Sequence, residues 1–160
     1  TMEEKISLAA SQTIHTYHCL CTHLLIATTT PLPSLPTRQN NTLDKAYIMP
    51  LPPPPSSNST PSSDSQHFGM LLSTTADKKP EIIRSDSGFE KRYMQRCGRC
   101  SLVVGYQLDW QQFAGEAGRR EGRREDVVYL VPGGFMTTQD MVKGKNMEGE
   151  IRFAGVTTVV

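Results

Sequence analysis

The stretch that decides the fold runs from residue 97 to residue 106 and reads Cys-Gly-Arg-Cys-Ser-Leu-Val-Val-Gly-Tyr. Its first four residues form a C-x-x-C motif, in which two thiolates can reach one metal ion while the backbone between them turns tightly. We expect Gly98 to supply the conformational freedom for this turn. The aliphatic residues that follow predict a β-strand from Leu102 to Tyr106. The stretch therefore predicts a metal-binding turn that leads into a strand.

A second cysteine pair, Cys19 and Cys21, forms a C-x-C motif closer to the N-terminus. In a flat strand, side chains at i and i+2 face the same side but lie roughly 6.6 Å apart. Two thiolates on one zinc ion, each at about 2.3 Å from the metal, must lie closer together than that. We therefore expect this pair to lie in a turn, between a strand at 13–19 and a second strand at 24–27.

One structural zinc ion is predicted, with four ligands: Cys19, Cys21, Cys97 and Cys100. The spacing by itself leaves two alternatives open, which are buried free cysteines and a redox or disulfide pair. A thioredoxin-like pair needs its C-x-x-C at a strand-to-helix step, whereas this motif precedes a valine-rich strand. Three histidines flank the first pair and could each replace a cysteine, although four cysteines already complete a closed site: His15, His18 and His23.

Apolar residues make up 37% of the 160-residue chain, below the usual fraction of about 45–50%. The clearest strand lies at 127–131, and a last strand is predicted at 151–153. A short amphipathic segment is predicted at 43–49. Thr137 followed by Asp140 predicts the cap of one short helical turn. The predicted fold class is mainly β, with a small α+β fold as the alternative: β-hairpins and a small sheet stapled by zinc.

Residues 50–65 consist almost wholly of Pro, Ser, Thr and Asn, a composition that buries too little apolar surface to offset the entropy of ordering. The tetraproline at 52–55 could dock to WW-type domains, but a stiff linker is the favoured interpretation. The predicted organisation has five segments. They are a flexible N-terminus at 1–11, two halves of a zinc-bound domain at 12–49 and 80–135, a disordered insertion at 50–79, and a C-terminal extension at 136–160.

The formal net charge is +1, from 17 basic and 16 acidic residues, so nucleic acid is not the default partner. Four arginines form a local cluster, but acidic residues interleave with them and favour a solvated loop: Arg119, Arg120, Arg123 and Arg124. Direct RNA binding through this loop is the alternative. No secretory signal and no stretch of roughly 18 apolar residues occur, so we expect an intracellular setting without a transmembrane segment.

Motifs typical of enzymes are missing from the sequence, which contains no nucleophile elbow, no P-loop and no paired zinc ligands with a glutamate base. Trp110 is expected to be a packing residue. A zinc-dependent enzyme acting on small thiols remains as an alternative, but it would need a second, open metal site, and no further cysteine is available. We therefore expect a protein that is not an enzyme and has no small-molecule substrate.

Two groups of residues resemble the family of the STING ER exit protein (STEEP). The first group comprises Tyr17-His18-Cys19-Leu20-Cys21, Leu35-Pro36-Thr37-Arg38 and Leu43-Asp44; the second comprises Gly88-Phe89-Glu90-Lys91-Arg92-Tyr93, Cys97-Gly98-Arg99-Cys100 and Tyr106-Gln107. Together they cover roughly residues 13–50 and 80–135. The family tends to have glycine after each cysteine pair, where this chain has Thr22 and Ser101.

The resemblance implies an adaptor that works through protein partners. Relatives in animals are linked to the export of a membrane sensor from the endoplasmic reticulum, with recruitment of phosphatidylinositol 3-kinase. Other relatives are associated with spliceosomes. The expected partners are therefore components of the trafficking machinery, with spliceosomal proteins as the alternative. The corresponding locations are the cytoplasm and the endoplasmic reticulum, with the nucleus as the alternative.

Overall fold

A computed structural model describes most of the chain between residues 13 and 157. The described residues are 13–39, 44–51, 67–85, 88–113, 115, 118, 120–143, 152–153 and 156–157. The predicted flexible terminus at 1–11 and the residues 52–66 of the predicted insertion lie outside these ranges. Within the described part, no helix is long and apolar enough to cross a bilayer.

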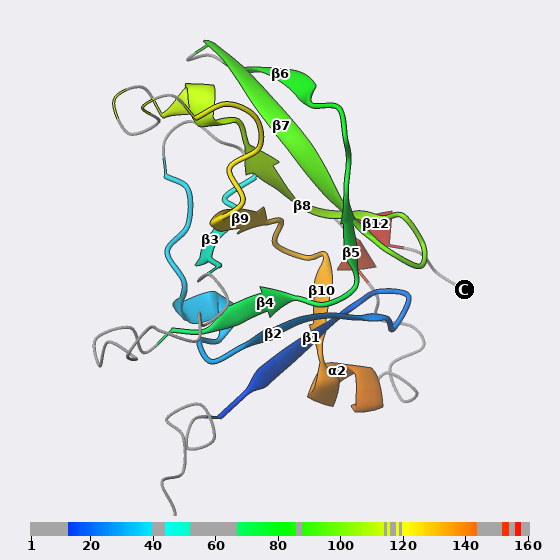
Figure 1. Ribbon diagram of the computed structural model, residues 1–160. Coiled ribbons are helices and arrows are strands. Elements are labelled where there is room, and N and C mark those ends of the chain that lie inside the picture. Colours follow the sequence, from blue (N-terminus) through cyan, green and yellow to red (C-terminus); the bar gives the residue numbers. More distant parts are fainter. Residues whose placement is uncertain are drawn as a thin grey trace, which may run out of the picture.

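The first sheet has four antiparallel strands in the order β10-β1-β2-β4 (Figure 1). Their bounds are β1 His15–Cys19, β2 Leu24–Thr28, β4 Gly69–Leu71 and β10 Phe135–Thr137. β1 and β2 form the hairpin that the sequence predicts, with the C-x-C motif at its turn. Leu25 and Ile26 in β2 are fully buried, which explains why this aliphatic stretch forms an inner strand of the sheet.

The second sheet has six strands and is built around the long strand β7. The bounds are β3 Tyr47–Pro50, β5 Thr74–Ala76, β6 Glu81–Ser85, β7 Gly88–Cys97, β8 Val103–Leu108 and β9 Val127–Leu130. The strands run in the order β3-β9-β8-β7-β5, and β6 also pairs with β7. The strands predicted at 102–106 and 127–131 are thereby confirmed as β8 and β9, whereas the predicted amphipathic segment at 43–49 ends in strand β3.

Helical structure is short in the described part of the chain. Two 3-10 turns span Leu32–Ser34 and Trp110–Gln112, and α2 spans Thr138–Lys143. The predicted cap of α2 is confirmed, because the Asp140 amide donates to Thr137 Oγ1 at 3.0 Å and the Thr137 amide donates back to Asp140 Oδ2 at 3.4 Å. Two further short strands pair with each other, β11 Arg152–Phe153 and β12 Val156–Thr157, so the strand predicted at 151–153 is also found.

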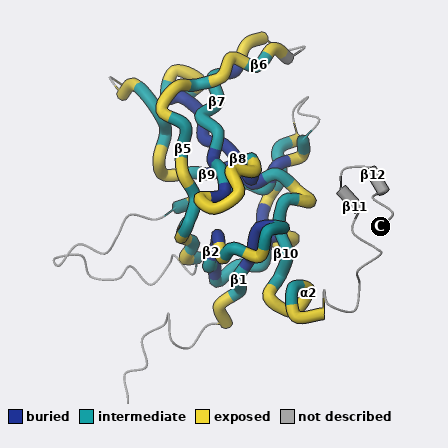
Figure 2. The backbone as a smooth tube through the Cα atoms, turned by 90° about the vertical axis from the view of Figure 1, so that its right-hand side faces the viewer, coloured by how far each residue is buried: buried dark blue, intermediate teal, exposed yellow. Residues whose placement is uncertain are grey.

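The main hydrophobic core joins the two sheets. Figure 2 colours the buried segments of the backbone dark blue. It contains residues from both: Tyr17, Cys19, Leu25, Ile26, Leu32, Leu35, Met49, Cys97, Val104, Val128 and Leu130. A second cluster forms around Ala46, Tyr106, Leu108 and Tyr129. Cys19 and Cys97 thus belong to the contact between the sheets. The predicted fold class, mainly β with four clustered cysteines, is confirmed.

Two predicted segment boundaries are wrong. The insertion predicted at 50–79 contains strands β4 and β5, which pair with β2 and β7. The sequence analysis missed these strands because each has only three residues and they follow a Pro/Ser-rich segment, although Met70, Leu71 and Leu72 were an apolar signal for the first of them. The boundary between 80–135 and 136–160 also falls inside β10, which pairs with β1. The folded domain therefore includes residues that the sequence analysis assigned to an extension.

Candidate metal centre

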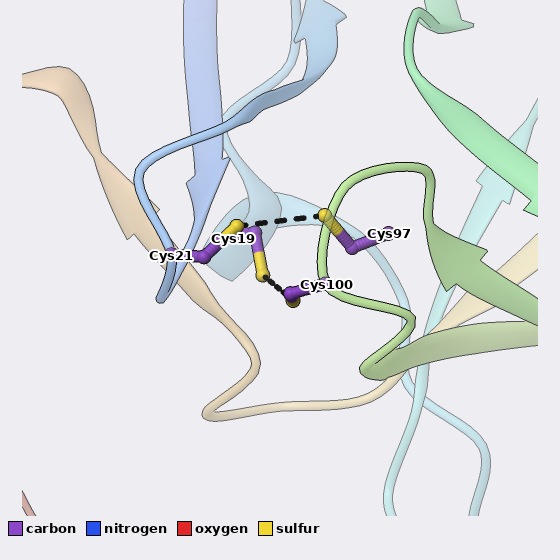
Figure 3. Close-up of side chains that lie close together, drawn as sticks. All are labelled: Cys19, Cys21, Cys97 and Cys100. Carbon is purple, nitrogen blue, oxygen red and sulfur yellow. Dashed lines mark hydrogen bonds between the residues drawn. The ribbon is translucent and has the colours of Figure 1, made fainter.

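Two turns, one from each sheet, carry the four cysteines (Figure 3). Cys19 is the last residue of β1 and Cys21 lies in the turn to β2. Cys97 is the last residue of β7 and Cys100 lies in the turn to β8. The four Sγ atoms all lie within 4.8 Å of one another. The tertiary fold therefore brings together all four cysteines that the sequence analysis singled out, and it places the C-x-C motif in the expected turn.

The distances between sulfur atoms fit a shared metal ion. Cys19 Sγ lies 3.5 Å from Cys100 Sγ, and Cys21 Sγ lies 3.6 Å from Cys97 Sγ. A disulfide would require about 2.05 Å, and all four cysteines are free. Four thiolates at about 2.3 Å from one tetrahedral ion lie about 3.8 Å apart. The cluster thus has the donor set and the dimensions of a four-sulfur metal site.

Each cysteine pair is followed by a residue in the left-handed backbone region. Thr22 has a φ of 77° and Ser101 has a φ of 63°. The conformation closes each turn tightly, since the Thr22 amide donates to the Cys19 carbonyl at 2.7 Å and the Ser101 amide to the Cys97 carbonyl at 2.9 Å. Glycine adopts this region without a steric penalty, whereas residues with a Cβ atom do so at a cost. The geometry explains why glycine suits these positions, and why this chain carries strain there.

Gly98 has a different role from the one predicted. Its φ lies outside the left-handed region, so conformational freedom is not what the turn requires of it. Instead, a Cβ atom at this position would lie 2.8 Å from the carbonyl oxygen of Ser73. That oxygen accepts a hydrogen bond from the Gly98 amide at 2.8 Å. Because Ser73 connects β4 to β5, Gly98 is needed where the cysteine turn contacts the crossing between the two sheets.

The thiols differ in how readily they ionise. Burial raises the pKa of Cys19 to about 12, and burial also raises the pKa of Cys21. Burial opposes ionisation of Cys97 as well, but the backbone amides of Cys100 and Arg99 stabilise its thiolate and lower its pKa to about 7. The amide nitrogen of Arg99 lies 3.4 Å from Cys97 Sγ. A bound cation would stabilise the remaining thiolates, because metal binding displaces protons from cysteine.

The histidines near the first pair lie outside the four-cysteine cluster in the described part of the chain. His18 is buried, and both of its ring nitrogens have other partners. Nδ1 lies 3.1 Å from the carbonyl oxygen of Thr22, and Nε2 lies 3.0 Å from Thr138 Oγ1. His18 thus supports the strained turn at Thr22 and connects it to α2. His15 and His23 are only half-buried.

Comparison with known families agrees with these features. A family model described as the STEEP1 domain matches residues 9–145. The chain belongs to the STEEP1 domain family. The match extends from before β1 to just beyond α2, so it includes both cysteine turns and both large sheets of this STEEP1 domain. The resemblance that the sequence motifs indicated is confirmed.

A second group of side chains, which we call the charge network, lies away from the cysteines and was not predicted as a unit. Its centre is Glu90, which accepts from Arg38 Nη1 at 2.7 Å, from Arg38 Nη2 at 3.2 Å and from Arg92 Nε at 2.9 Å. Asp44 Oδ2 accepts from Arg92 Nη1 at 3.1 Å and from the Tyr106 hydroxyl at 2.7 Å. These five residues define the network: Arg38, Asp44, Glu90, Arg92 and Tyr106.

Aromatic rings complete the charge network. Tyr106 and Tyr129 stack with their ring centroids 5.3 Å apart. The guanidinium of Arg92 lies 4.0 Å from the Tyr106 centroid, and that of Arg38 lies 5.0 Å from the Tyr129 centroid. Burial alone would raise the pKa of Glu90, but the two guanidiniums outweigh it and hold that pKa below its usual range. The charged residues at alternate positions of the Glu90-Lys91-Arg92 motif were the sequence signal for this cluster.

The arginine loop is only partly solvated. The Arg120 and Arg124 guanidiniums lie 4.7 Å and 4.8 Å from the Trp110 ring. Arg124 also donates to Asp126 at 2.8 Å, and Arg123 donates to Glu125 at 3.0 Å. Adjacent carboxylates therefore neutralise these arginines, as the sequence indicates. Arg119 lies outside the described residues.

Proposed function

We propose that this STEEP1 domain is a non-enzymatic adaptor whose fold is held together by one zinc ion, and that it acts in exit from the endoplasmic reticulum through contacts with other proteins. The observation that carries the proposal is the convergence of four cysteine sulfurs from two turns that belong to different sheets. A metal ion at this position joins the two halves of the domain. The site residues are Cys19, Cys21, Cys97 and Cys100.

Zinc is the metal that this donor set favours. Four thiolates in a tetrahedral arrangement are typical of structural zinc and of iron–sulfur sites. Zinc binds four thiolates as a single ion that undergoes no redox chemistry and has no geometric preference from its d-electrons. Two short turns, each presenting two thiols, are the usual way in which proteins hold structural zinc.

The non-enzymatic role is supported by the number of protein ligands. A catalytic zinc site keeps one coordination position open for water or substrate, whereas four cysteines fill a tetrahedral shell. Cys19 and Cys97 are also almost fully buried, at 0% and 1% exposure. A metal ion held there contributes to folding, and the function then depends on surfaces that the fold presents.

The trafficking role is supported by membership of the family. The relatives to which the sequence motifs point are linked to export of a membrane protein from the endoplasmic reticulum. An adaptor in that process needs a stable scaffold and exposed contact surfaces, and this domain offers several exposed apolar side chains on its strands.

Metal analysis tests the first part of the proposal. The purified full chain should contain about one equivalent of zinc, and a strong chelator should abolish its cooperative thermal transition. A matched Cys100→Ser variant should lose the metal. Iron in place of zinc, or a fold that is unaffected by metal removal, would contradict the proposal.

Affinity capture from native cells tests the second part. The wild-type chain should retain trafficking proteins that the Cys100→Ser chain loses. Recovery of splicing factors in their place would assign the domain to the spliceosomal alternative and overturn the trafficking role.

A further inference from the structure

Strands β6 and β7 form a ribbon that extends beyond the second sheet, at the top of Figure 1. β8 pairs with β7 only from Arg92 onward, whereas β6 pairs with residues 88–92 of β7. The first part of β7 therefore has β6 as its main partner. A two-stranded ribbon is marginally stable by itself and depends on packing against one of its faces.

One face of the ribbon is covered. Side chains alternate between the faces of a strand, so Ile83, Glu90 and Arg92 share one face through the cross-strand pair Ile83↔Glu90. Glu90 is only 9% exposed, because the charge network connects it to Arg38 and Arg92. This face anchors the ribbon to the domain.

The opposite face is open. It is formed by two cross-strand pairs, Ile82↔Lys91 and Arg84↔Phe89. Phe89 is 69% exposed and Ile82 is 55% exposed, and they are diagonal neighbours at a distance that long side chains can bridge. Figure 2 shows β6 as an exposed segment. We call these four residues the open ribbon face. Its apolar pair is accompanied by two basic side chains and no acidic one. Arg84 is exposed, whereas Lys91 is half-buried and its ammonium donates to Gln111 Oε1 at 3.0 Å.

The outer edge of β6 adds backbone groups to this surface. Among the described strands, β6 pairs only with β7. Every second residue of such an edge strand directs its N–H and C=O groups away from its neighbour. These groups can pair with an extended peptide, which adds a strand to the sheet.

We infer that the open ribbon face and the edge of β6 bind an extended peptide in which the residues at every second position, which share one face of the added strand, include both acidic and apolar side chains. The peptide backbone pairs with β6. On that face, apolar side chains of the peptide cover Phe89 and Ile82, and carboxylates approach the exposed Arg84. Exposed Lys78 and Lys79 precede β6 and extend the basic surface along the edge. This inference deepens the proposed adaptor function by naming the surface that contacts a partner.

The features of the surface favour a peptide over an anionic lipid surface. Lipid headgroups can attract the basic side chains, but they cannot form the regular hydrogen bonds that a strand edge offers. The open ribbon face ends near strand β5, where a polar pocket of about 740 Å³ is lined in part by Lys78, Tyr93 and Glu125. Charged groups of this pocket already pair with one another, as Arg123 does with Glu125, so we assign the peptide to the ribbon and not to the pocket.

Selection from a random peptide library displayed on phage tests the inference, with the folded, metal-loaded full chain as target. We expect the enriched peptides to combine acidic and apolar residues at positions i and i+2, which lie on one face of an extended strand. Phe89→Ser and Arg84→Gln should each weaken their binding by about tenfold or more. N-methylation of alternate peptide amides should abolish binding, because it blocks strand pairing. Val142→Ser is the matched control, since Val142 on α2 is 70% exposed, and it should leave binding unchanged.

The inference is overturned if no peptide is enriched, if the enriched peptides lack acidic residues, or if Phe89→Ser leaves their binding unchanged. If phosphatidylserine vesicles bind the chain through Phe89 and no peptide does, the surface faces lipid instead. Phe89 and Arg84 are both exposed, so we expect their substitution to leave the fold intact. Circular dichroism of each variant checks that a loss of binding is not caused by unfolding. If Cys100→Ser loses cellular partners that Phe89→Ser retains, the ribbon inference fails while the adaptor proposal stands.

Discussion

The cysteine centre and the charge network both join segments that are far apart in the sequence, but they do so with opposite electrostatics. Cys19 and Cys100 are 81 positions apart, and Arg38 and Glu90 are 52 positions apart. The charge network contains two arginines and two carboxylates, so its charges balance without any added ion. The cysteine centre contains only thiols, whose ionised forms repel one another.

The stability contributed by the charge network and the stability contributed by the cysteine centre should therefore depend on different solution conditions. The charge network needs no added ion, because its own arginines and carboxylates balance, so its contribution to stability should vary mainly with pH. In the proposed metal site, a cation holds together four thiolates whose sulfur atoms lie within 4.8 Å of one another. The contribution of the cysteine centre should therefore vary with metal supply. The comparison can be tested by disrupting each region separately.

Removing one cysteine should have the largest effect. Cys100 is exposed, so Cys100→Ser removes one proposed metal ligand without creating a cavity in the core. Zinc binding by four cysteines contributes on the order of 10 kcal/mol to folding, which is comparable to the total stability of a domain. We expect the variant to lose its cooperative thermal transition and its near-UV circular dichroism signal.

The control for this prediction is Ser101→Ala, which changes a neighbouring residue and leaves every thiol in place. A Cys100→Ser variant that unfolds at the wild-type temperature would indicate that the cysteines are packing residues rather than ligands.

Neutralising the centre of the charge network should have an intermediate effect. Glu90→Gln leaves Arg38 and Arg92 without their shared carboxylate, at side-chain exposures of only 18% and 15%. Breaking a buried ion pair on one side costs about 3–5 kcal/mol, and we expect about 3 kcal/mol from chemical denaturation of the metal-loaded protein. Glu125→Gln is the control, because Glu125 is 75% exposed in its pair with Arg123, and it should cost less than about 1 kcal/mol. Equal effects of the two substitutions would contradict the distinction.

The charge network should also have a characteristic pH dependence. The pKa of Glu90 is lowered in the folded state, so its stabilising contribution is fully present above the ordinary glutamate pKa of about 4.3 and is lost as pH falls through the lower, folded-state value. The free energy of unfolding of wild type minus that of Glu90→Gln should therefore shrink in acid. Protons that displace the metal affect both proteins alike, and the subtraction removes that effect. A difference that stays constant down to the acid limit would contradict the assignment.

Relieving strain in a cysteine turn should have the smallest effect. Ser101 has a φ of 63°, and a left-handed conformation costs a residue with a Cβ atom roughly 1–2 kcal/mol. Ser101→Gly should therefore raise the free energy of unfolding by about 1 kcal/mol, less what glycine adds to the entropy of the unfolded chain. Ser101→Ala keeps the Cβ atom and should bring no gain. A stabilisation by both variants would point to the lost hydroxyl group instead of the backbone.

Much of the fold could be predicted where local sequence has a local physical consequence. The aliphatic stretches of β2, β8 and β9 predicted strands, and the C-x-C spacing predicted a turn, because two thiolates at strand spacing are too far apart to share a metal. Strands β4 and β5 were missed. Residues 69–76 include Met70, Leu71 and Leu72, but each strand has only three residues, and their pairing with β2 and β7 depends on strands far away in the sequence.

The sequence by itself determined the mainly β character, the four cysteines as one candidate site, and the resemblance to the STEEP family, since all three depend on residue type and spacing. Only the tertiary structure decided that the two cysteine turns meet across two sheets, that Gly98 is needed for its contact with Ser73, and that Arg38, Asp44, Glu90 and Arg92 form one network. These features depend on distances between residues far apart in the chain. Such distances are set when the sheets pack together, and no local pattern in the sequence encodes them.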